Sequence, residues 1–330
     1  MTDEHNSFED LIIIGAGPAG LAASQYAARS MLKVLVLEQM SPGGQALSID
    51  VLENYPGISP GKSGFEFVDE MHKQAENFGA KFLYEAAEAI SKDGDLFTVQ
   101  ITGGQKKKSR AVILATGAKY RTLDVPGEKE YYGRGVSYCA TCDGPFFKDK
   151  KIFVVGGGDA ACDEAQYLSR LSSQVILIHR RERFRAQKAL AERVLKNPNI
   201  EVRFNTVIKE IKGSGGMGGK VTSLVLARTL EKSGLETDAE STEESADGVF
   251  VFTGTVPQSA FLSGGGLKVE MDSSGYVITG EDMSTSLPGL FAAGDLRTTP
   301  FRQVVTAAAD GAIAARSASH YIEKLKGEAY

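Results

Sequence analysis

Cysteine is rare in this chain, with only three among 330 residues. That number is odd, and it is too small for the disulfide framework of a small secreted protein. The first ten residues are polar and acidic, unlike the apolar core of a secretory signal. We therefore expect a reducing, cytoplasmic setting, in which a close pair of cysteines is catalytic or metal-binding.

Two further features that the sequence lacks exclude a membrane-spanning helix and argue against a protein that binds nucleic acid. No apolar run reaches the length of about 18 residues that a membrane-spanning helix needs. The net charge is −5, so there is no excess of basic residues for nucleic acid or an anionic membrane. Hydrophobic residues make up 42% and charged residues 24%, as in ordinary soluble proteins. A chain of this length predicts about two domains.

The chain contains two glycine-rich loops in the same local setting. The apolar run 11–14 predicts a buried parallel strand that leads into the loop 15–20, a helix over 21–29 and a strand over 34–37. The same order returns as strand 151–155, loop 156–161, a helix to about residue 171, and strand 175–178. Each set is typical of a βαβ nucleotide-binding unit.

The remaining strands favour an insertion of one domain into the other. A third strand over 111–114 ends in Ala115, Thr116 and Gly117, and a strand near 289–292 enters a turn at Asp295 before a final helix. Both pieces suit the first nucleotide unit. The predicted fold is therefore α/β with two Rossmann-like dinucleotide-binding domains. The first comprises residues 1–122 and 248–330, and the second, residues 123–247, is inserted into it.

The first loop has the glycine spacing of a dinucleotide fingerprint. Gly15 permits the tight turn, Gly17 lets the backbone approach a pyrophosphate, and Gly20 lets helix and strand pack closely. Pro18 and Ala19 complete the loop at the helix N-terminus, where free N–H groups favour an anion. Glu38 ends the second strand, where an acid binds a ribose 2′-hydroxyl and repels a 2′-phosphate. The pattern predicts FAD or NAD(H), with a tight turn of another α/β fold as the alternative.

The second loop differs at the end of its second strand. Gly156, Gly158 and Ala161 give the fingerprint, with Asp159 and Ala160 between them. The strand ends in a basic cluster instead of an acid, formed by His179, Arg180, Arg181 and Arg185. Guanidinium groups bind phosphate oxygens, so this unit is predicted to prefer NADPH. The alternative is that residues 179–185 are the solvated start of a helix.

The two sites together suggest FAD and NADPH, with hydride passing from nicotinamide to flavin. The loop 41–45, which contains Gly44 and Gln45, follows the Glu38 strand and is expected to approach the flavin ring. Asp295 is expected to reach the ribityl chain.

A cysteine pair lies just ahead of the second loop, at Cys139 and Cys142, and is followed by Asp143. A C-x-x-C beside βαβ patterns is typical of a redox pair, in which a lowered thiol pKa makes one thiolate a nucleophile. Asp143 is a candidate proton carrier; the alternative is that it only begins the turn at Gly144 and Pro145. A zinc site would need a further cysteine or histidine pair with ligand spacing, and the sequence offers none.

These features together resemble the low-molecular-weight, bacterial-type thioredoxin reductases over nearly the whole chain. The matching segments are GAGPAG at 15–20, GGQ at 43–45, ENYPG at 53–57, ATGA at 115–118, VSYCATCDG at 136–144, VVGGGDAA at 154–161, HRRERFRA at 179–186, FAAGD at 291–295 and RQVVTAA at 302–308. The resemblance implies a homodimeric FAD enzyme that uses NADPH to reduce the disulfide of thioredoxin.

The resemblance also implies roles for individual residues. Cys139 and Cys142 would be the redox pair, with the first attacking the partner's disulfide and the second nearer the flavin. The 2′-phosphate contacts would be His179, Arg180, Arg181 and Arg185. The flavin contacts would be Gln45, Asn54, Asp295, Arg302, Gln303 and Val304. Gln258 stands where the family has asparagine, which puts the contacts of that turn in doubt.

Two further expectations follow. Because the cysteine pair and the flavin belong to different domains, we expect the inserted domain to rotate about crossings near 122–126 and 247–250. The main alternative in function is a related flavin disulfide reductase that serves another redoxin or a peroxiredoxin. Cys162, on the start of the second unit's helix, is expected to be a small buried residue.

Overall fold

The structure is a computed structural model that describes residues 8–49, 52, 54–58, 62–216, 218–229 and 237–327. The chain forms two compact units. Unit 1 comprises Met1–Lys119 and Val256–Tyr330, and unit 2 comprises Tyr120–Thr255. No helix of the described residues is both long enough and apolar enough to cross a membrane.

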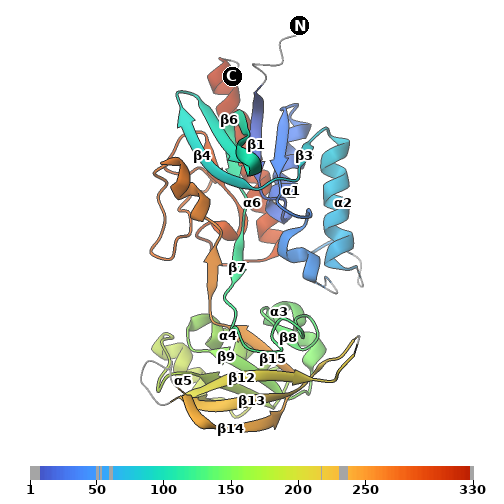
Figure 1. Ribbon diagram of the computed structural model, residues 1–330, viewed down its shortest axis with the longest axis vertical. Helices are drawn as coiled ribbons and strands as arrows, with labels where there is room; N and C mark the ends of the chain where they lie inside the picture. Colours follow the sequence, from blue (N-terminus) through green and yellow to red (C-terminus); the bar gives the residue numbers. More distant parts are fainter. Residues whose placement is uncertain are drawn as a thin grey trace. The chain divides into compact units, whose positions relative to one another are not determined.

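Unit 1 is built on a seven-stranded sheet (Figure 1). Its parallel part consists of β3 (Lys81–Leu83), β2 (Val34–Leu37), β1 (Glu9–Ile14), β6 (Lys106–Leu114) and β17 (Leu290–Ala292). Its antiparallel extension consists of β5 (Leu96–Ile101) and β4 (Ala87–Asp93). The run 11–14 is apolar throughout because both faces of β1 are covered. Leu11 and Ile13 pack with the helices, and Ile12 and Ile14 pack with the residues of β5 and β17.

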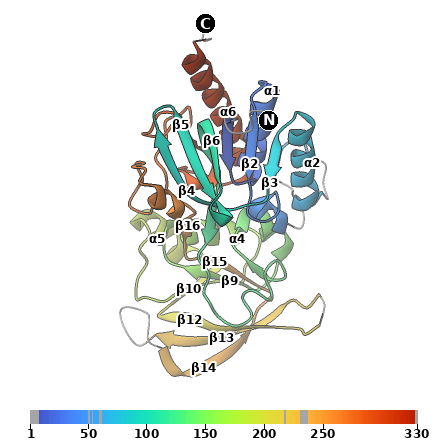
Figure 2. The same ribbon diagram turned by 45° about the horizontal axis from the view of Figure 1, so that its top comes forward.

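Three helices belong to this unit: α1 (Pro18–Arg29), α2 (Gly64–Asn77) and α6 (Val304–Lys326). Figure 2 shows α1 and α6 beside each other. Their close approach requires Gly311, because a Cβ there would collide with the carbonyl oxygen of Ala19. Helix α2 begins with a reciprocal capping box between Ser63 and Glu66.

Unit 2 has a parallel sheet with helices on one face and a second sheet on the other. The parallel order is β11 (Ile200–Phe204), β10 (Val175–His179), β9 (Ile152–Gly156), β15 (Gly248–Phe252) and β8 (Val136–Ser137). The helices are α3 (Ala140–Asp143), α4 (Asp159–Leu168) and α5 (Lys188–Lys196), and the second sheet is β12 (Thr206–Gly213), β13 (Val221–Thr229) and β14 (Thr237–Ser245). Ile152 and Val154 pack with the helices, while Phe153 and Val155 pack with β12 and β13.

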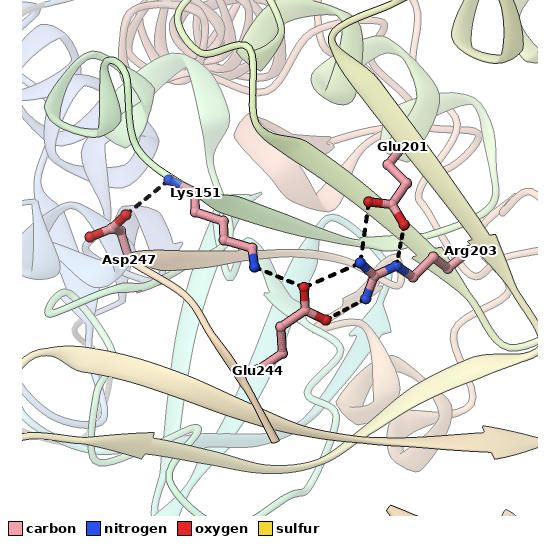
Figure 3. Close-up of polar contacts among 5 residues, drawn as sticks. All are labelled: Lys151, Glu201, Arg203, Glu244 and Asp247. Carbon is pink, nitrogen blue, oxygen red and sulfur yellow. Dashed lines mark hydrogen bonds and ion pairs between the residues drawn. The ribbon is translucent and has the colours of Figure 1, made fainter. Parts of the chain in front are cut away.

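The polar, acidic composition of residues 231–247 favours an exposed hairpin or loop. This stretch contains strand β14, which pairs antiparallel with β13; residues 231–236 lie outside the described part of the chain. Neighbouring acidic residues of β14 form ion pairs with basic residues from different parts of unit 2. Glu243 pairs with Lys212 of β12 at 2.8 Å. Glu244 pairs with Lys151 at 2.8 Å and with Arg203 of β11 (Figure 3). The strand therefore tolerates its negative charge because basic side chains of the same unit neutralise it.

Figure 3 shows how this network closes around the start of β9. The Arg203 guanidinium also binds Glu201, at 2.6 Å from its Nε, and the backbone N–H of Lys151 donates to Asp247 at 2.9 Å. Hydrogen bonds from Arg203, with a further one from Lys151, lower the pKa of Glu244 to about 2. The network joins β9, β11 and β14 by charge-assisted hydrogen bonds.

The chain passes between the units twice. Strand β7 (Ala118–Tyr120) makes the first crossing and pairs with β16 (Thr255–Pro257), which makes the second. The observed division falls at 119/120 and 255/256, whereas the sequence placed it at 122/123 and 247/248. Gly248–Phe252 lies in unit 2 because it pairs with β9 as strand β15.

Candidate active site

The first glycine-rich loop joins β1 to α1 in unit 1. Gly15 has φ +99°, and a Cβ there would collide with the carbonyl oxygen of Ala115. A Cβ at Gly20 would collide with the carbonyl oxygen of Gly15, so helix and strand need a glycine at this contact. A Cβ at Gly17 would meet nothing within 4 Å. Open space over Gly17 at the helix N-terminus fits the approach of a pyrophosphate.

Glu38 lies beside this loop, directly after β2. Its Oε2 accepts a hydrogen bond from the Ala16 backbone N–H at 2.8 Å, and its Oε1 accepts one from the Met40 N–H at 3.0 Å. The carboxylate is thus fixed at the carboxyl end of the sheet, the edge at which open α/β sheets bind their ligands. Its predicted role toward a ribose stays a prediction.

The loop 41–45 and the end of β6 lie against the same glycine-rich loop. The Gly43 N–H donates to the carbonyl of Ala16 at 2.7 Å, and the Gln45 side-chain amide donates to the carbonyl of Ala118. A Cβ built on Gly44, which has φ +55°, would lie 3.2 Å from Gly17 Cα. The structure therefore brings the predicted residues Gly44 and Gln45 together with the fingerprint.

The turn at Gln258, where the sequence departs from the family pattern, is fixed mainly by its backbone. Its N–H donates to the carbonyl of Gly117 at 2.9 Å, and its carbonyl accepts from the Thr116 hydroxyl at 2.7 Å. The Gln258 side-chain amide donates to the carbonyl of Val256 at 3.2 Å. These contacts to Thr116 and Gly117 do not depend on the side chain that differs.

Asp295 follows β17 in a short 3₁₀ turn, Gly294–Leu296. Burial raises the pKa of its carboxyl to about 6; Arg302 opposes this rise and Asp310 adds to it. Among the described residues, none donates a hydrogen bond to this carboxylate. A partly buried carboxylate that lacks donors fits a hydroxyl-rich ligand such as the ribityl chain of FAD.

The N-terminus of α6 adds the last group of predicted flavin contacts. Gln303 caps the helix and accepts a hydrogen bond from the Asn54 amide at 2.9 Å, and Val304 is the first helical residue. The Arg302 guanidinium lies 4.3 Å from the centre of the Tyr276 ring, and its buried Nε has no partner in the described structure. The predicted residues of unit 1 thus gather around one group of loops, which fits FAD.

The second glycine-rich loop joins β9 to α4 in unit 2. A Cβ at Gly156 would collide with Cβ of Ala161, whereas one at Gly158 would meet nothing within 4 Å. Asp159, the first residue of α4, accepts a hydrogen bond from the Gln187 backbone N–H at 2.7 Å. Its neighbour Ala160 forms the second position of the helix. Gly158 therefore leaves open space at the N-terminus of its helix, as Gly17 does in the first loop.

The basic cluster begins where β10 ends, beside this loop. The Arg185 N–H donates to the carbonyl of Gly157 at 2.7 Å, which ties the basic segment to the glycine-rich loop. His179 is buried, and its ring lies over Gly157. Burial, together with Arg185, Arg181 and Arg180, lowers the pKa of His179 to about 4, so the imidazole is neutral at pH 7.

Two nitrogens of this cluster have no partner in the described structure: His179 Nε2 and Arg181 Nε. Both are buried, so each favours an acceptor brought by a ligand. Arg180 and Arg185 are exposed. The arrangement fits a phosphate group next to the second loop, and the solvated-helix alternative explains neither the buried imidazole nor the hydrogen bond to Gly157.

Cys139 and Cys142 form a disulfide, with their Cα atoms 5.3 Å apart. Cys139 is the N-cap of α3, and its Sγ accepts a hydrogen bond from the Cys142 N–H at 3.2 Å. The predicted redox pair is therefore formed, and both residues are partly exposed. Cys162 is fully buried, and burial raises the pKa of its thiol to about 11, so it is not a redox candidate.

Asp143 is the last residue of α3 and is partly exposed. Its Oδ2 accepts a hydrogen bond from the Ser137 hydroxyl at 2.5 Å, and the same hydroxyl oxygen accepts one from the Cys139 N–H at 3.1 Å. Ser137, which the sequence analysis did not single out, thus connects the carboxylate to the cysteine segment. No pattern in the sequence indicates that its side chain is buried.

Comparisons with known proteins agree with this site. A family model described as "Pyridine nucleotide-disulphide oxidoreductase" matches residues 9–311. The chain belongs to this family of oxidoreductases. The membership confirms the predicted family and enzyme class.

Within the family, this chain is similar to proteins named thioredoxin reductase. It is 50% identical to the one from Treponema pallidum over 96% of this chain and 98% of that protein. It is 44% identical to the one from Bacillus subtilis, over 96% of both chains. A crystal structure from Streptococcus pyogenes covers 97% of this chain and 99% of its own, with 41% identity and a TM-score of 0.87. These likenesses confirm the predicted fold with two Rossmann-type domains.

Proposed function

We propose that the chain is a thioredoxin reductase, which passes electrons from NADPH through FAD to the Cys139–Cys142 disulfide and then to oxidised thioredoxin. The observation that carries this proposal is the disulfide itself, formed within the unit that holds the second dinucleotide loop. A nucleotide-binding module without turnover would leave the disulfide unexplained.

The enzyme uses FAD and NADPH as cofactors. We assign FAD to unit 1, with Gly17 open to the pyrophosphate and Asp295 ready to accept hydrogen bonds. We assign NADPH to unit 2, with Gly158 open to the pyrophosphate and the basic cluster next to it. Bound FAD supplies a two-electron acceptor for the hydride of NADPH and a two-electron donor for a disulfide.

Reduction opens the Cys139–Cys142 bond and leaves one thiol and one thiolate. In the assignment carried over from the family, Cys139 attacks one sulfur of the thioredoxin disulfide; a mixed disulfide forms, and one thioredoxin sulfur leaves as a thiolate. Cys142 then attacks Cys139, which restores the internal disulfide and releases the second thioredoxin sulfur. The Cys142 N–H directed at Cys139 Sγ favours negative charge on that sulfur.

The cycle also needs a proton carrier, because each released thioredoxin sulfur must be protonated to become a thiol. Asp143 is adjacent to Cys142, and its partial exposure allows proton exchange with water. The Ser137 hydroxyl, which donates to Oδ2, holds the carboxylate toward the cysteine segment. The alternative role of Asp143, as the start of a turn, predicts no effect on dithiol exchange.

We further infer that unit 2 rotates relative to unit 1 during the cycle, because the disulfide must receive electrons within the enzyme and then meet a protein. The crossings at β7 and β16 are the expected hinges. A solved structure of the Lactococcus lactis thioredoxin reductase, 39% identical over 96% of this chain, is named for an "FR conformation".

Thioredoxin is the proposed partner, and another redoxin or a peroxiredoxin is the alternative. We also propose a homodimer in the cytoplasm. The dimer rests on the family resemblance, and the cytoplasmic setting rests on the small number of cysteines.

The test is NADPH oxidation followed with thioredoxin from the same organism, with NADH as the nucleotide control. Cys139→Ser and Cys142→Ser should each abolish the thioredoxin-dependent rate and retain NADPH oxidation with ferricyanide, which needs no disulfide. If the unmodified enzyme shows no rate with thioredoxin, the proposed substrate is wrong. A rate with another redoxin would then identify the alternative.

A further inference from the structure

A buried carboxylate, Glu128, lies between the first crossing and the cysteine pair. It is 1% exposed. Its Oε1 accepts from the Tyr138 hydroxyl at 2.7 Å, and both oxygens accept from the Leu123 N–H, at 2.8 and 3.0 Å. Its Oε2 also accepts from the Asp124 N–H at 2.8 Å. Among the described residues, no cation forms an ion pair with it.

Such a carboxylate is expensive to bury unless its hydrogen bonds are all made. A charged acceptor also makes each of these bonds stronger than a bond between neutral groups. Glu128 is therefore well suited to fix the relative positions of its donors. Those donors belong to two segments whose positions matter for the proposed cycle.

The first segment is residues 122–124, which continue the first crossing from β7 into unit 2. Asp124 has φ +58°, a conformation that a residue with a side chain seldom adopts. The Thr122 hydroxyl donates to the Asp124 carboxylate at 2.8 Å, and the Asp124 N–H is held by Glu128. The backbone of the crossing is thus kept in an uncommon conformation by hydrogen bonds, one of them to Glu128.

The second segment immediately precedes the disulfide. Tyr138 directly precedes Cys139 in the sequence. Its ring stacks on that of Tyr120, the last residue of β7, with the ring centres 5.0 Å apart. Leu123 and Tyr138 also pack against the same hydrophobic cluster. Burial and the hydrogen bond to Glu128 raise the pKa of the Tyr138 phenol, so it remains a donor at neutral pH.

We propose that Glu128 is a positioning residue that couples the conformation of the first crossing to the position of Cys139, through its hydrogen bond to Tyr138. A change in backbone conformation at residues 122–124 moves the N–H groups of Leu123 and Asp124, which donate hydrogen bonds to the carboxylate. The carboxylate transmits that change to Tyr138 and to the cysteine next to it. This inference rests on the proposed function, because it concerns the delivery of electrons to the disulfide.

The test measures how fast the Cys139–Cys142 disulfide is reduced, without using thioredoxin. One equivalent of NADPH is added to the holoenzyme under anaerobic conditions, and the new thiols are trapped with N-ethylmaleimide at successive times. Buried Cys162 does not contribute under native conditions. NADPH oxidation with ferricyanide is measured in parallel, because it reports steps that precede the disulfide.

Tyr138→Phe removes only the hydroxyl and keeps the ring, and Glu128→Gln keeps the shape of the side chain. Each should slow thiol formation about tenfold, since a hydrogen bond to a charged group contributes about that much. The ferricyanide rate and the KM for NADPH should not change. The double variant should be no slower than Glu128→Gln, because both changes remove the same link.

Tyr132→Phe is the matched control. Its ring packs edge-on against Tyr138 with centres 5.5 Å apart, and its hydroxyl is not among the groups that Glu128 accepts from. It should form thiols at the unmodified rate. Equal losses of thiol formation and ferricyanide rate in Tyr138→Phe would overturn the proposal, as would unmodified thiol formation. If NADPH reduces the disulfide of the unmodified enzyme, Tyr138→Phe slows that reduction, and the unmodified enzyme shows no turnover with thioredoxin, only the proposed substrate is wrong.

Discussion

Gly157 and Gly158 are adjacent in the second loop, yet the structure predicts opposite effects of alanine at the two positions. At Gly158 the backbone is extended, with φ −98° and ψ −177°, and a Cβ would meet nothing within 4 Å. At Gly157 a Cβ would collide with the buried ring of His179. Alanine at 158 should therefore be tolerated by the fold, and alanine at 157 should not.

The magnitudes follow from these surroundings. Gly158→Ala affects the N-cap of α4, which costs less than about 1 kcal/mol. Gly157→Ala overpacks a buried contact, which costs about 1–3 kcal/mol and, at roughly 2–4 °C per kcal/mol for a protein of this size, lowers Tm by about 2–12 °C. For the affinity for NADPH, we expect Gly158→Ala to have the larger effect, because its methyl group occupies the space where the pyrophosphate would approach the backbone. We expect the Kd for NADPH of Gly158→Ala to rise about tenfold or more.

The assays are thermal unfolding without NADPH and titration of NADPH into the holoenzyme. FAD content is measured as a control, because unit 1 is unchanged by either substitution. If Gly158→Ala binds NADPH as tightly as the unmodified enzyme, the second loop does not carry the pyrophosphate. If Gly157→Ala is as stable as the unmodified enzyme, the packing of His179 over the loop is wrong.

Three further predictions concern the acids and the third cysteine. Asp143→Asn should slow dithiol–disulfide exchange with thioredoxin and leave the ferricyanide rate intact; equal losses in both would argue against a proton carrier. Because hydrogen bonds from Arg203 and Lys151 lower the pKa of Glu244 from 4.5 to about 2, its stabilisation is present above about pH 4.5 and is lost as pH falls toward 2. Glu244→Gln should cost about 2–3 kcal/mol at pH 7 and flatten this part of the acid-unfolding curve. Cys162→Ala should leave turnover with thioredoxin unchanged, and a loss of turnover would show that its thiol takes part.

Much of the fold was predictable because its signals are local. The first loop is recognisable since only glycine fits at Gly15 and Gly20, where a Cβ would collide with a carbonyl oxygen. In the second loop, a Cβ at Gly156 would collide with Cβ of Ala161. Strands β1 and β9 are recognisable in the sequence as continuous apolar runs. Such runs are required because other elements cover both faces of each strand.

The boundary and the acidic strand were not predictable in the same way. An apolar run at 248–252 does not reveal which sheet receives it, and its partner β9 lies far upstream in the sequence. The stretch that contains β14 is polar and acidic, which is typical of an exposed hairpin or a loop, and composition alone does not tell which of the two forms. Its strand is stabilised by Lys212, Lys151 and Arg203, which are distant in the sequence. Such contacts become visible only when the chain is folded.

The two acids on either side of the disulfide show why the site also needed the structure. In the sequence, Asp143 is a candidate proton carrier because it directly follows Cys142, whereas no pattern singles out Glu128. A proton carrier must exchange protons with water, and Glu128 is 1% exposed, whereas Asp143 is partly exposed. The donors differ as well: Glu128 is held by two backbone N–H groups and a phenol, which fix the chain around it. We therefore propose Asp143 for proton transfer and Glu128 for the positioning of Cys139.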